Sequence, residues 1–340
     1  MINTDYRVKV LLSKSTYEAL INDMIVFEYK NGDKINKGGF INQLFASYHQ
    51  TYDNQINQMM TDYDKKITNY VLNTIKDKVS TKELNTIEKN INAKYLEYIK
   101  KINKINKDEL NKEISFKINK ANQDEFETIY YNTFLPNDTV SSYFRNLLDS
   151  YARLSQDIRE TIIFKKSYDK IIKAIEKKQK ILIKYQGEKE IISPYRIAQS
   201  IDENHNYLIG INEDKSIKGF RLCLIEDVII LNDVYIYDRK MNTIITDTIE
   251  NGPEFSTSSA INVEIKLTPL GEKWYQQIVS NRPKLIKKEH DSYFFYCSED
   301  QIRAYFFTFG SNVTIIKPIS LQNQFIQEYQ KALQNYKKMA

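Results

Sequence analysis

Histidine and cysteine, the side chains that most often bind metals or act as nucleophiles, are rare in this sequence of 340 residues. The histidines, His49, His205 and His290, lack the HExxH spacing of a zinc site, and the cysteines, Cys223 and Cys297, do not form a CxxC pair. The sequence also lacks the GxSxG, GxxxxGK(S/T) and GxGxxG patterns that position a nucleophile or a phosphate. We therefore expect no enzyme, no metal and no cofactor, and we expect both cysteines to be small buried apolar side chains.

Basic and aromatic side chains are the chemistry that the sequence offers in quantity. It contains 49 Lys and Arg against 44 Asp and Glu, a formal net charge of +5, together with 25 Tyr and 16 Phe. Between residues 165 and 196, ten Lys and Arg stand against four Asp and Glu, a local balance of 10 − 4 = +6. Because cations attract phosphates and tyrosines stack on bases, this composition permits nucleic-acid binding without requiring it.

The elements that would carry these side chains begin with a strand and two helices. Residues 6–12 alternate between apolar and polar side chains, which predicts a strand. Ser15 and Glu18 have the spacing of a capping box, which predicts the start of a helix. A second helix is predicted to begin at Gly38 and Gly39, with apolar residues at helical spacing behind them.

The same order of elements recurs in the next part of the chain. Residues 113–118 alternate as a second strand, and Asn122 with Glu125 gives another capping pattern. Residues 143–151 align with residues 40–48 of the second helix. The offset between the copies is 119 − 13 = 106 residues at the end of the strand and 143 − 40 = 103 in the second helix, so the first copy would have a loop three residues longer.

One strand and two helices cannot bury their apolar faces alone, so we expect the copies to pair their strands as an antiparallel ribbon over four helices. This arrangement resembles the ribbon-helix-helix fold, in which alternate ribbon side chains enter the major groove of DNA. The sequence leaves open whether the copies pair within one chain or between chains. Val8, Val10, Leu12, Ile114, Phe116 and Ile118 would face the core, and Leu11 and Glu113 would face outward. The resemblance implies nucleic-acid contacts by Arg7, Lys9, Ser115 and Lys117, and a phosphate at the bare amides of Gly38 and Gly39.

A helical insertion at residues 53–107 interrupts this nucleic-acid-binding module, which spans residues 1–160. Apolar residues recur in the insertion every three or four positions, and Ser80 and Thr81 break the run and cap a second helix. We expect an antiparallel helical hairpin whose apolar stripe packs in the core or in a dimer contact.

Residues 165–238 begin with a basic amphipathic helix and continue with five or six short strands, which indicates a small antiparallel barrel. Tyr185, Ser193 to Ile197, Asn206 to Gly210 and Phe220 to Leu222 follow one another in an order that resembles the WYL domain. That family has an Sm/SH3-like barrel and occurs mostly in bacterial transcription regulators and CRISPR-associated proteins. This sequence departs from the family at three positions: Asn206 replaces the namesake Trp, and Cys223 and Leu224 replace an Asp and a basic residue.

The resemblance implies a ligand-sensing site, often for nucleic acid or a nucleotide. A guanidinium beside tyrosines suits a phosphate with a stacked base. Arg196 and His205 are added to the site as sequence neighbours of the matching residues. The predicted ligand-binding residues are Tyr185, Tyr195, Arg196, His205, Tyr207 and Arg221.

The C-terminal third is predicted to begin after a polar linker at residues 238–259 that contains Asn251, Gly252 and Pro253. Residues 259–340 then read as β-α-β-β-α-β-α, a ferredoxin-like arrangement with an added helix. The segments 307–311 and 316–321 resemble the C-terminal extension that often follows WYL domains. That extension implies dimerisation.

The fold class expected is therefore α+β and multidomain: a duplicated ribbon-helix-helix module, a small barrel and a ferredoxin-like domain. The leading hypothesis is a cytoplasmic, homodimeric transcription regulator that binds duplex DNA and senses a nucleotide or nucleic-acid ligand. A single-stranded RNA-binding accessory protein that partners a CRISPR effector is an alternative, and a scaffold that has lost ligand binding is another. The sequence has no apolar run long enough for a membrane span and no signal-peptide pattern, so no membrane partner is expected.

Overall fold

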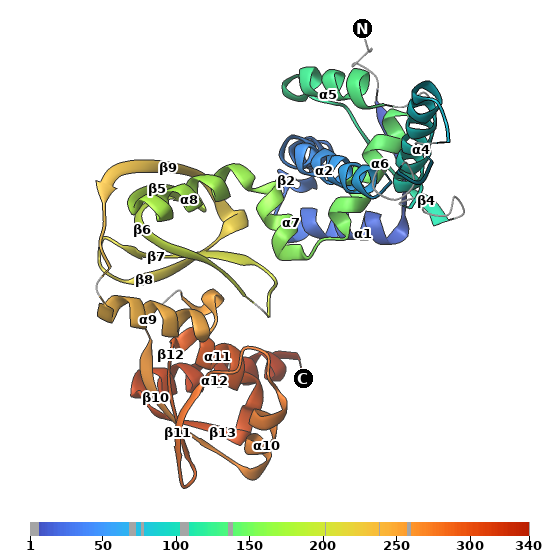
Figure 1. Ribbon diagram of the computed structural model, residues 1–340. Helices are drawn as coiled ribbons and strands as arrows, with labels where there is room; N and C mark the ends of the chain where they lie inside the picture. Colours follow the sequence, from blue (N-terminus) through green and yellow to red (C-terminus); the bar gives the residue numbers. More distant parts are fainter. Residues whose placement is uncertain are drawn as a thin grey trace. The chain divides into compact units, whose positions relative to one another are not determined.

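The computed structural model describes residues 7–67, 73–75, 78–102, 109–134, 139–200, 202–237, 239–256 and 260–339. The chain divides into two compact units, residues 1–165 and residues 166–340, and each contains both helices and strands. The strands of the described residues form small sheets in which all pairs are antiparallel (Figure 1). No helix in the described ranges is both long and apolar enough to cross a membrane.

The first unit consists of a two-stranded ribbon, a small hairpin and helices around them. The predicted loop at residues 135–138 lies outside the described residues, as do Tyr6 and parts of the insertion. The elements are β1 (Val8–Ser13), α1 (Lys14–Val26), β2 (Lys30–Asn31), β3 (Lys34–Ile35), α2 (Lys37–Ile67), α3 (Asn73–Ile75), α4 (Thr81–Ile102), β4 (Leu110–Phe116), α5 (Lys120–Thr133), α6 (Val140–Ala152) and α7 (Gln156–Ile163).

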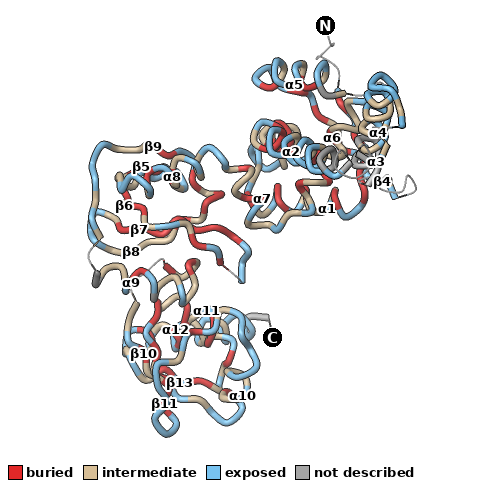
Figure 2. Tube along the Cα trace, in the orientation of Figure 1, coloured by how far each residue is buried: buried red, intermediate tan, exposed pale blue. Residues whose placement is uncertain are grey.

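The predicted pairing of the two repeat strands is confirmed, and it occurs within one chain. β1 runs antiparallel to β4, with Val10 opposite Ile114 and Lys9 opposite Ser115. The predicted alternation is also confirmed, because side chains on one ribbon face are buried and those on the other are exposed or half-buried (Figure 2). The buried members are Val8, Val10, Leu12, Ile114, Phe116 and Ile118.

The helices that follow the two ribbon strands are capped at equivalent positions. The side chain of Ser13 accepts a hydrogen bond from the amide of Thr16 at the start of α1. The side chain of Asn119 accepts one from the amide of Asn122 at the start of α5. The capping patterns in the sequence predict these caps at Ser15 and at Asn122, and that placement is wrong, since each helix begins two or three residues earlier.

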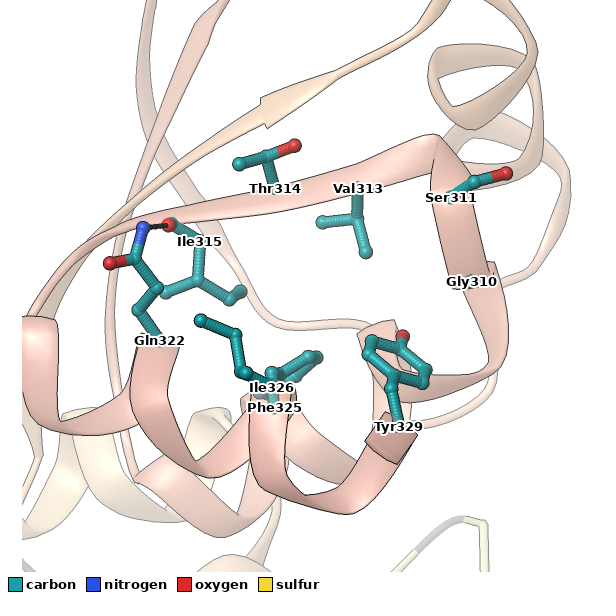
Figure 3. A pocket seen from close by; sticks show the side chains of 9 residues that line it. All are labelled: Gly310, Ser311, Val313, Thr314, Ile315, Gln322, Phe325, Ile326 and Tyr329. Atoms are coloured by element: carbon teal, nitrogen blue, oxygen red, sulfur yellow. Dashed lines mark hydrogen bonds between the residues drawn. The ribbon is translucent and has the colours of Figure 1, made fainter. Parts of the chain in front are cut away.

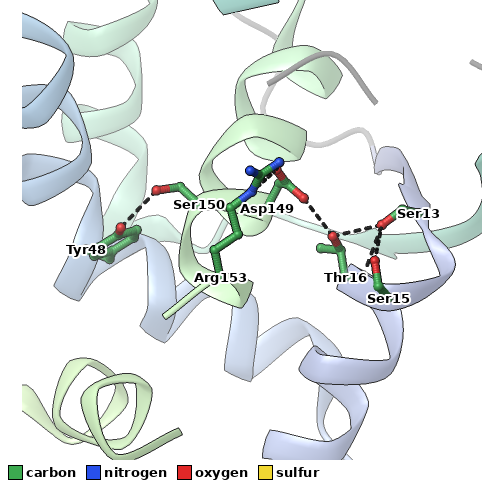
Figure 4. Close-up of polar contacts among 7 residues, drawn as sticks. All are labelled: Ser13, Ser15, Thr16, Tyr48, Asp149, Ser150 and Arg153. Atoms are coloured by element: carbon green, nitrogen blue, oxygen red, sulfur yellow. Dashed lines mark hydrogen bonds and ion pairs between the residues drawn. The ribbon is translucent and has the colours of Figure 1, made fainter. Parts of the chain in front are cut away.

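The second helices of the two copies meet in the core of the unit. The rings of Tyr48 and Tyr151, which align in the repeat, lie 6.2 Å apart, and the hydroxyls of Tyr48 and Ser150 lie 3.0 Å apart. On the other side of α6, Asp149 accepts hydrogen bonds from Thr16 at 2.9 Å and from Arg153 at 2.9 Å (Figure 4). Polar side chains of α6 therefore connect it to both helices of the first copy.

A buried ion pair fixes α7 against α1. Asp23 is fully buried and accepts from Arg159 Nε at 2.7 Å and from Arg159 Nη2 at 2.8 Å. The hydroxyl of Tyr151 donates to the same carboxylate at 2.8 Å. Because both carboxylate oxygens have donors, the cost of burying this charge is offset by charge-assisted hydrogen bonds.

The insertion is helical as expected, but its first helix is continuous with the second helix of the first copy. α2 begins at Lys37 and continues without a break to Ile67, so it serves as the second helix of the first copy and as the first helix of the insertion. α4 contacts α2 and is capped by Ser80, whose amide and hydroxyl both donate to Glu83. Residues 68–72, 76–77 and 103–108 of the predicted hairpin lie outside the described residues.

The second unit contains two sheets. The first has the order β8-β7-β6-β5-β9, and the second has the order β11-β12-β10-β13. The elements are α8 (Lys165–Lys177), β5 (Gln179–Tyr185), β6 (Glu188–Gln199), β7 (Asn206–Asn212), β8 (Ile217–Arg221), β9 (Ile225–Val234), α9 (Arg239–Glu250), β10 (Ile261–Leu267), α10 (Pro269–Gln277), β11 (Leu285–Glu289), β12 (Ser292–Cys297), α11 (Glu299–Phe306), β13 (Val313–Lys317) and α12 (Ile319–Met339).

Strand β6 continues through Pro194 without a break. The register with β7 shifts between Pro194 and Arg196, so a bulge absorbs the residue that has no amide hydrogen. Gly210 lies opposite this bulge, where an added Cβ would come within 2.6 Å of the Ser193 carbonyl oxygen. Only glycine therefore lets β7 approach the bulged strand this closely.

The predicted linker at residues 238–259 was wrong, because most of it folds as α9 and a short 3-10 turn, Pro253–Phe255. Ile245 is fully buried against β7, with Met241 and Ile249 packed beside it. These apolar residues recur at helical spacing, a signal that the polar composition of the segment obscures. The break at Asn251 and Gly252 is where α9 ends.

The predicted order of elements in the C-terminal third is confirmed, and all neighbouring strands of its sheet are antiparallel. The core of this sheet includes Cys297 and Phe306, both buried. Trp274 packs edge-on against Phe309 with ring centroids 5.6 Å apart. Both cysteines are buried, as the sequence predicts, and they do not form a disulfide with each other.

Candidate nucleic-acid interface and ligand site

The outer face of the ribbon carries the residues predicted to contact nucleic acid. Arg7 and Lys9 are exposed, Ser115 is half-buried, and Lys117 is exposed directly after β4. The β1·β4 register brings Lys9 and Ser115 opposite each other. Pairing the strands thus gathers basic side chains from two distant parts of the sequence on one face, which we call the ribbon face. It comprises Arg7, Lys9, Leu11, Glu113, Ser115 and Lys117.

The ribbon face also contains one acidic and one large apolar side chain. Lys9 Nζ lies 3.9 Å from Glu113 Oε1, and both side chains are at least half exposed. Leu11, opposite Glu113, is 44% exposed. An exposed ion pair of this kind contributes little to stability, but the carboxylate reduces the attraction of Lys9 for a phosphate.

Of the two glycines at the start of α2, Gly39 does not offer the bare amide that its sequence position suggests. The amide of Gly39 donates to Asn36 Oδ1 at 2.9 Å, so the helix already has a side-chain cap. An added Cβ on Gly39 would lie 2.4 Å from the Asn36 side chain, which explains why the cap requires glycine there. Gly38 provides its carbonyl oxygen to Asn42 and lies beside Phe116. Phosphate binding at Gly39 would therefore require displacement of Asn36.

Four of the six residues predicted to bind a ligand lie together at one end of the five-stranded sheet. Arg221 on β8 is opposite Tyr207 on β7, and its Nη2 contacts His205 Nε2. Tyr185 packs edge-on against Phe220, with ring centroids 5.2 Å apart. The fourth member, His205, is 2% exposed, whereas Arg221 is half-buried. The Nε atom of Arg221 is buried and has no hydrogen-bond partner.

The tyrosine hydroxyls of this cluster are held in their protonated form. Burial raises the pKa of Tyr185, and burial together with a hydrogen bond to Glu203 raises the pKa of Tyr207. The hydroxyl of Tyr207 donates a hydrogen bond to Glu203 Oε2. The cluster therefore presents neutral phenols beside one guanidinium, which is a suitable chemistry for a phosphate with an adjacent ring.

Tyr195 and Arg196 do not join this cluster. Tyr195 packs edge-on against Tyr237 at 5.2 Å, and Tyr237 in turn contacts Tyr235 at 4.8 Å. Arg196, opposite Ile209, is exposed. Sequence reasoning missed Tyr235 and Tyr237, which follow β9 directly, although their Tyr-x-Tyr spacing would place them on one face of an extended segment.

The basic helix α8 borders the same sheet. Its apolar face is buried through Ile171 and Ala174, and its polar face is rich in lysine. Lys170 is tied to β9 by an ion pair with Asp227 at 3.3 Å. The exposed lysines of α8 and the residue after it are Lys165, Lys166, Lys173, Lys177 and Lys178.

An apolar groove of about 480 Å³ lies between β13 and α12 (Figure 3). β13 is an edge strand, and Gln322 Nε2 donates to the carbonyl oxygen of Ile315 at 2.8 Å, so part of the edge is already paired. Ile326 and Tyr329 of α12 line the groove opposite Val313. None of the predicted site residues belongs to this groove.

Comparison with known proteins gives a likeness of fold. No protein-family model matches the sequence, and no curated protein matches it significantly. A solved structure described as a CRISPR Cas-related protein matches with a TM-score of 0.71 and 19% identity, covering 98% of this chain and 95% of that one. Proteasome accessory factor B/C of Arthrobacter aurescens matches with a TM-score of 0.29 and 13% identity, covering 67% of this chain and 39% of its own. The chain therefore shares the fold of the CRISPR Cas-related protein along nearly its whole length.

Proposed function

We propose that this protein is a non-catalytic, CRISPR-associated regulator that binds nucleic acid through its ribbon face. The observation that carries the proposal is the pairing of β1 with β4, which gathers Arg7, Lys9 and Lys117 on one exposed surface. Basic side chains on a ribbon can contact both phosphates and guanine edges in a major groove. The likeness of fold to a CRISPR Cas-related protein supports a CRISPR context.

The topology of the ribbon module, of the five-stranded sheet and of the C-terminal sheet supports the fold that we propose for each of them. The strand–helix–helix repeat with equivalent caps at Ser13 and Asn119 supports a duplicated ribbon-helix-helix module. The five-stranded antiparallel sheet supports a WYL-type barrel, and the sheet order β13-β10-β12-β11 supports a ferredoxin-like C-terminal domain.

The sensing role in the proposal belongs to the cluster of Tyr185, His205, Tyr207 and Arg221. A phosphate of a nucleotide would compete with His205 for the guanidinium of Arg221, and the unpartnered Nε atom offers it a second donor. Such a ligand changes nucleic-acid affinity only if it binds two arrangements of the protein with different free energies.

A second candidate function is single-stranded RNA binding as an accessory of a CRISPR effector. The half-buried rings of Tyr195, Tyr235 and Tyr237 favour it, since unpaired bases can stack on aromatic side chains. If neither duplex DNA nor single-stranded RNA binds in the competition assay below, the remaining hypothesis is a scaffold that binds no nucleic acid.

Homodimerisation through α12 is part of the proposal. Ile319, Ile326 and Leu333 are large, exposed and seven residues apart, and Tyr336, which is also exposed, follows Leu333 by three residues. A stripe with this period is typical of helices that pack against a second helix.

A competition assay between labelled duplex DNA and single-stranded RNA tests the choice of polymer. The groove-reading function predicts that one duplex sequence displaces random duplex, and that this preference disappears in Arg7→Ala/Lys9→Ala. The RNA function predicts tighter binding to single strands, with Arg221→Ala as the most damaging substitution. The proposal fails if neither polymer binds below about 10 μM at physiological salt, a range typical of non-specific binding.

A further inference from the structure

A small polar cavity of about 150 Å³ lies in the second unit, and its lining does not include Tyr185, His205, Tyr207 or Arg221. It is bounded by the end of β6, the turn after α9, the loop after α10 and the first turn of α11. The cavity therefore lies where the five-stranded sheet meets the C-terminal sheet. The lining residues that carry the argument are Asp202, Glu250, Glu254, Asn281, Arg282 and Gln301.

Three side-chain oxygens at this cavity are buried and accept no hydrogen bond. They are Glu254 Oε2, Asn281 Oδ1 and Gln301 Oε1. Gln301 is only 1% exposed, so water from the surface does not satisfy its oxygen freely. A buried acceptor without a donor costs about 1–3 kcal/mol, so three such atoms around one cavity favour the binding of an electropositive group.

The hydrogen bonds of the side-chain nitrogen determine the orientation of the Gln301 amide. Nε2 donates to the carbonyl oxygen of Asn251 at 2.6 Å and lies 3.5 Å from that of Asn281. Exchanging the nitrogen and oxygen would place Oε1 against two carbonyl oxygens, which is unfavourable. The oxygen must therefore point away from those carbonyls.

The charges around the cavity also favour a cation. Asp202, Glu250 and Glu254 are three carboxylates against the guanidinium of Arg282 and the ammonium of Lys284, which pairs with Glu250 at 3.0 Å, a formal balance of 2 − 3 = −1. The guanidinium of Arg282 is committed elsewhere, since it lies over the Tyr275 ring at 5.6 Å and donates to the Tyr275 carbonyl at 3.2 Å.

We propose that this cavity binds a divalent cation with a preference for oxygen ligands, held by Gln301 Oε1, Asn281 Oδ1 and Glu254 Oε2. Amide and carboxylate oxygens drawn from several loops form a flexible ligand set, which suits Ca²⁺ better than the strict octahedron of Mg²⁺. Bound there, the ion links the turn after α9 to the loop after α10 and to α11. It would thus stabilise the junction between the two sheets of the second unit.

Calorimetric titration of the metal-free full-length chain tests this site, first with Ca²⁺ and then with Mg²⁺. The expected result is saturable binding of one Ca²⁺ per chain, with Mg²⁺ binding at least tenfold more weakly. Tb³⁺ should occupy the same site and show luminescence on tyrosine excitation, because Tyr275 lies beside Arg282 at the cavity wall.

Two variants and a control make the test specific. Glu254→Gln keeps the shape of the side chain and should weaken Ca²⁺ binding at least tenfold, and Gln301→Met should do the same if its far-UV circular dichroism is unchanged. Glu289→Gln, an exposed carboxylate paired with Lys287 on β11, should bind as the unaltered chain does. Absence of saturable Ca²⁺ binding up to about 10 mM, or unchanged affinity in Glu254→Gln, would overturn the proposal.

Discussion

Asn42 and Arg145 occupy the same position in the two copies of the repeat, and each holds the ribbon strand of the other copy. Asn42 Nδ2 donates to the carbonyl oxygen of Lys117 at 2.8 Å, and Arg145 Nε donates to that of Leu11 at 2.8 Å. The donors are 145 − 42 = 103 residues apart and the acceptors 117 − 11 = 106, the two offsets of the repeat. The two copies therefore exchange equivalent contacts, so that neither ribbon strand is held by its own copy alone.

Replacing Asn42 by Leu should destabilise the first unit by about 2–3 kcal/mol. Asn42 is buried, donates to two carbonyl oxygens, and accepts from the amide of Asn119, so its loss leaves several buried groups unpaired. Urea unfolding followed by far-UV circular dichroism measures the effect. Trp274 is the single tryptophan and lies in the second unit, so its fluorescence transition serves as an internal control and should not move.

Arg145→Ala provides the comparison for this prediction. Arg145 is half-buried and makes its hydrogen bond at an exposed position, so its loss should cost about 1 kcal/mol or less. An equal or larger cost for Arg145→Ala than for Asn42→Leu would contradict the view that burial of the unpaired groups decides the effect.

Removing Asp23 should be among the most damaging single changes in the first unit. Asp23→Ala leaves the buried guanidinium of Arg159 without its carboxylate, which costs about 3–5 kcal/mol in comparable buried pairs. The double variant Asp23→Leu/Arg159→Met removes both charges and should recover most of the loss. If the double variant is as unstable as Asp23→Ala in the same unfolding experiment, the uncompensated charge is not the cause.

The ribbon could be predicted well because the pattern that indicates each strand lies within a few consecutive residues. The alternation of Val8, Val10 and Leu12 with exposed neighbours determines which side chains are buried, and the repeat itself predicts the partner strand. The buried pair of Asp23 and Arg159 was not predictable in this way, because the two residues are 136 positions apart and neither belongs to a recognisable motif.

The candidate site was predicted less completely than the ribbon. The structure brings Tyr185, His205, Tyr207 and Arg221 together, and only Tyr207 and Arg221 lie on adjacent strands, so a ligand at this cluster stays a prediction. The sequence could not show that the Asn36 side chain accepts a hydrogen bond from the amide of Gly39, because this contact depends on the fold of the loop before α2. The cap occupies the amide that a phosphate would need. The three unpartnered oxygens at the polar cavity come from three separate segments and leave no pattern in the sequence.

Glu113→Gln should strengthen nucleic-acid binding by the ribbon face. The carboxylate lies 3.9 Å from Lys9 Nζ and repels phosphates, whereas the amide is neutral and of similar shape. We expect affinity to rise about two- to fivefold at low salt, a gain of about 0.4–1 kcal/mol, and the gain should shrink as salt is added because both groups are exposed. Fluorescence anisotropy at two salt concentrations measures it, and a lower affinity at low salt would contradict the placement of Glu113 on the binding face.

The stability of the second unit without added metal should fall as the pH rises above the pKa of an unfolded glutamate, 4.5. Burial, together with the charges of Glu203 and Asp202, raises the pKa of Glu254 in the folded chain. The folded state therefore binds the proton more tightly than the unfolded state does, and this stabilisation is present at acidic pH and is lost as Glu254 ionises.

Glu254→Gln removes this pH-dependent contribution. The variant should be more stable than the unaltered chain at pH 7 and similar to it at pH 4, in thermal melts followed by Trp274 fluorescence in the presence of a chelator. A variant that is less stable at pH 7 under these conditions would show that the ionised carboxylate is satisfied in the folded chain.

Fluorescence anisotropy titration of the Arg7→Ala/Lys9→Ala variant most directly tests whether the ribbon face binds nucleic acid. Lys14→Ala/Lys34→Ala, which removes two exposed lysines of the same unit outside the ribbon face, is the matched control for charge. We predict that the ribbon variant binds duplex DNA or single-stranded RNA at least tenfold more weakly than the unaltered chain, while the control loses threefold or less. Equal losses in the two variants, or no loss in the ribbon variant, would contradict the account.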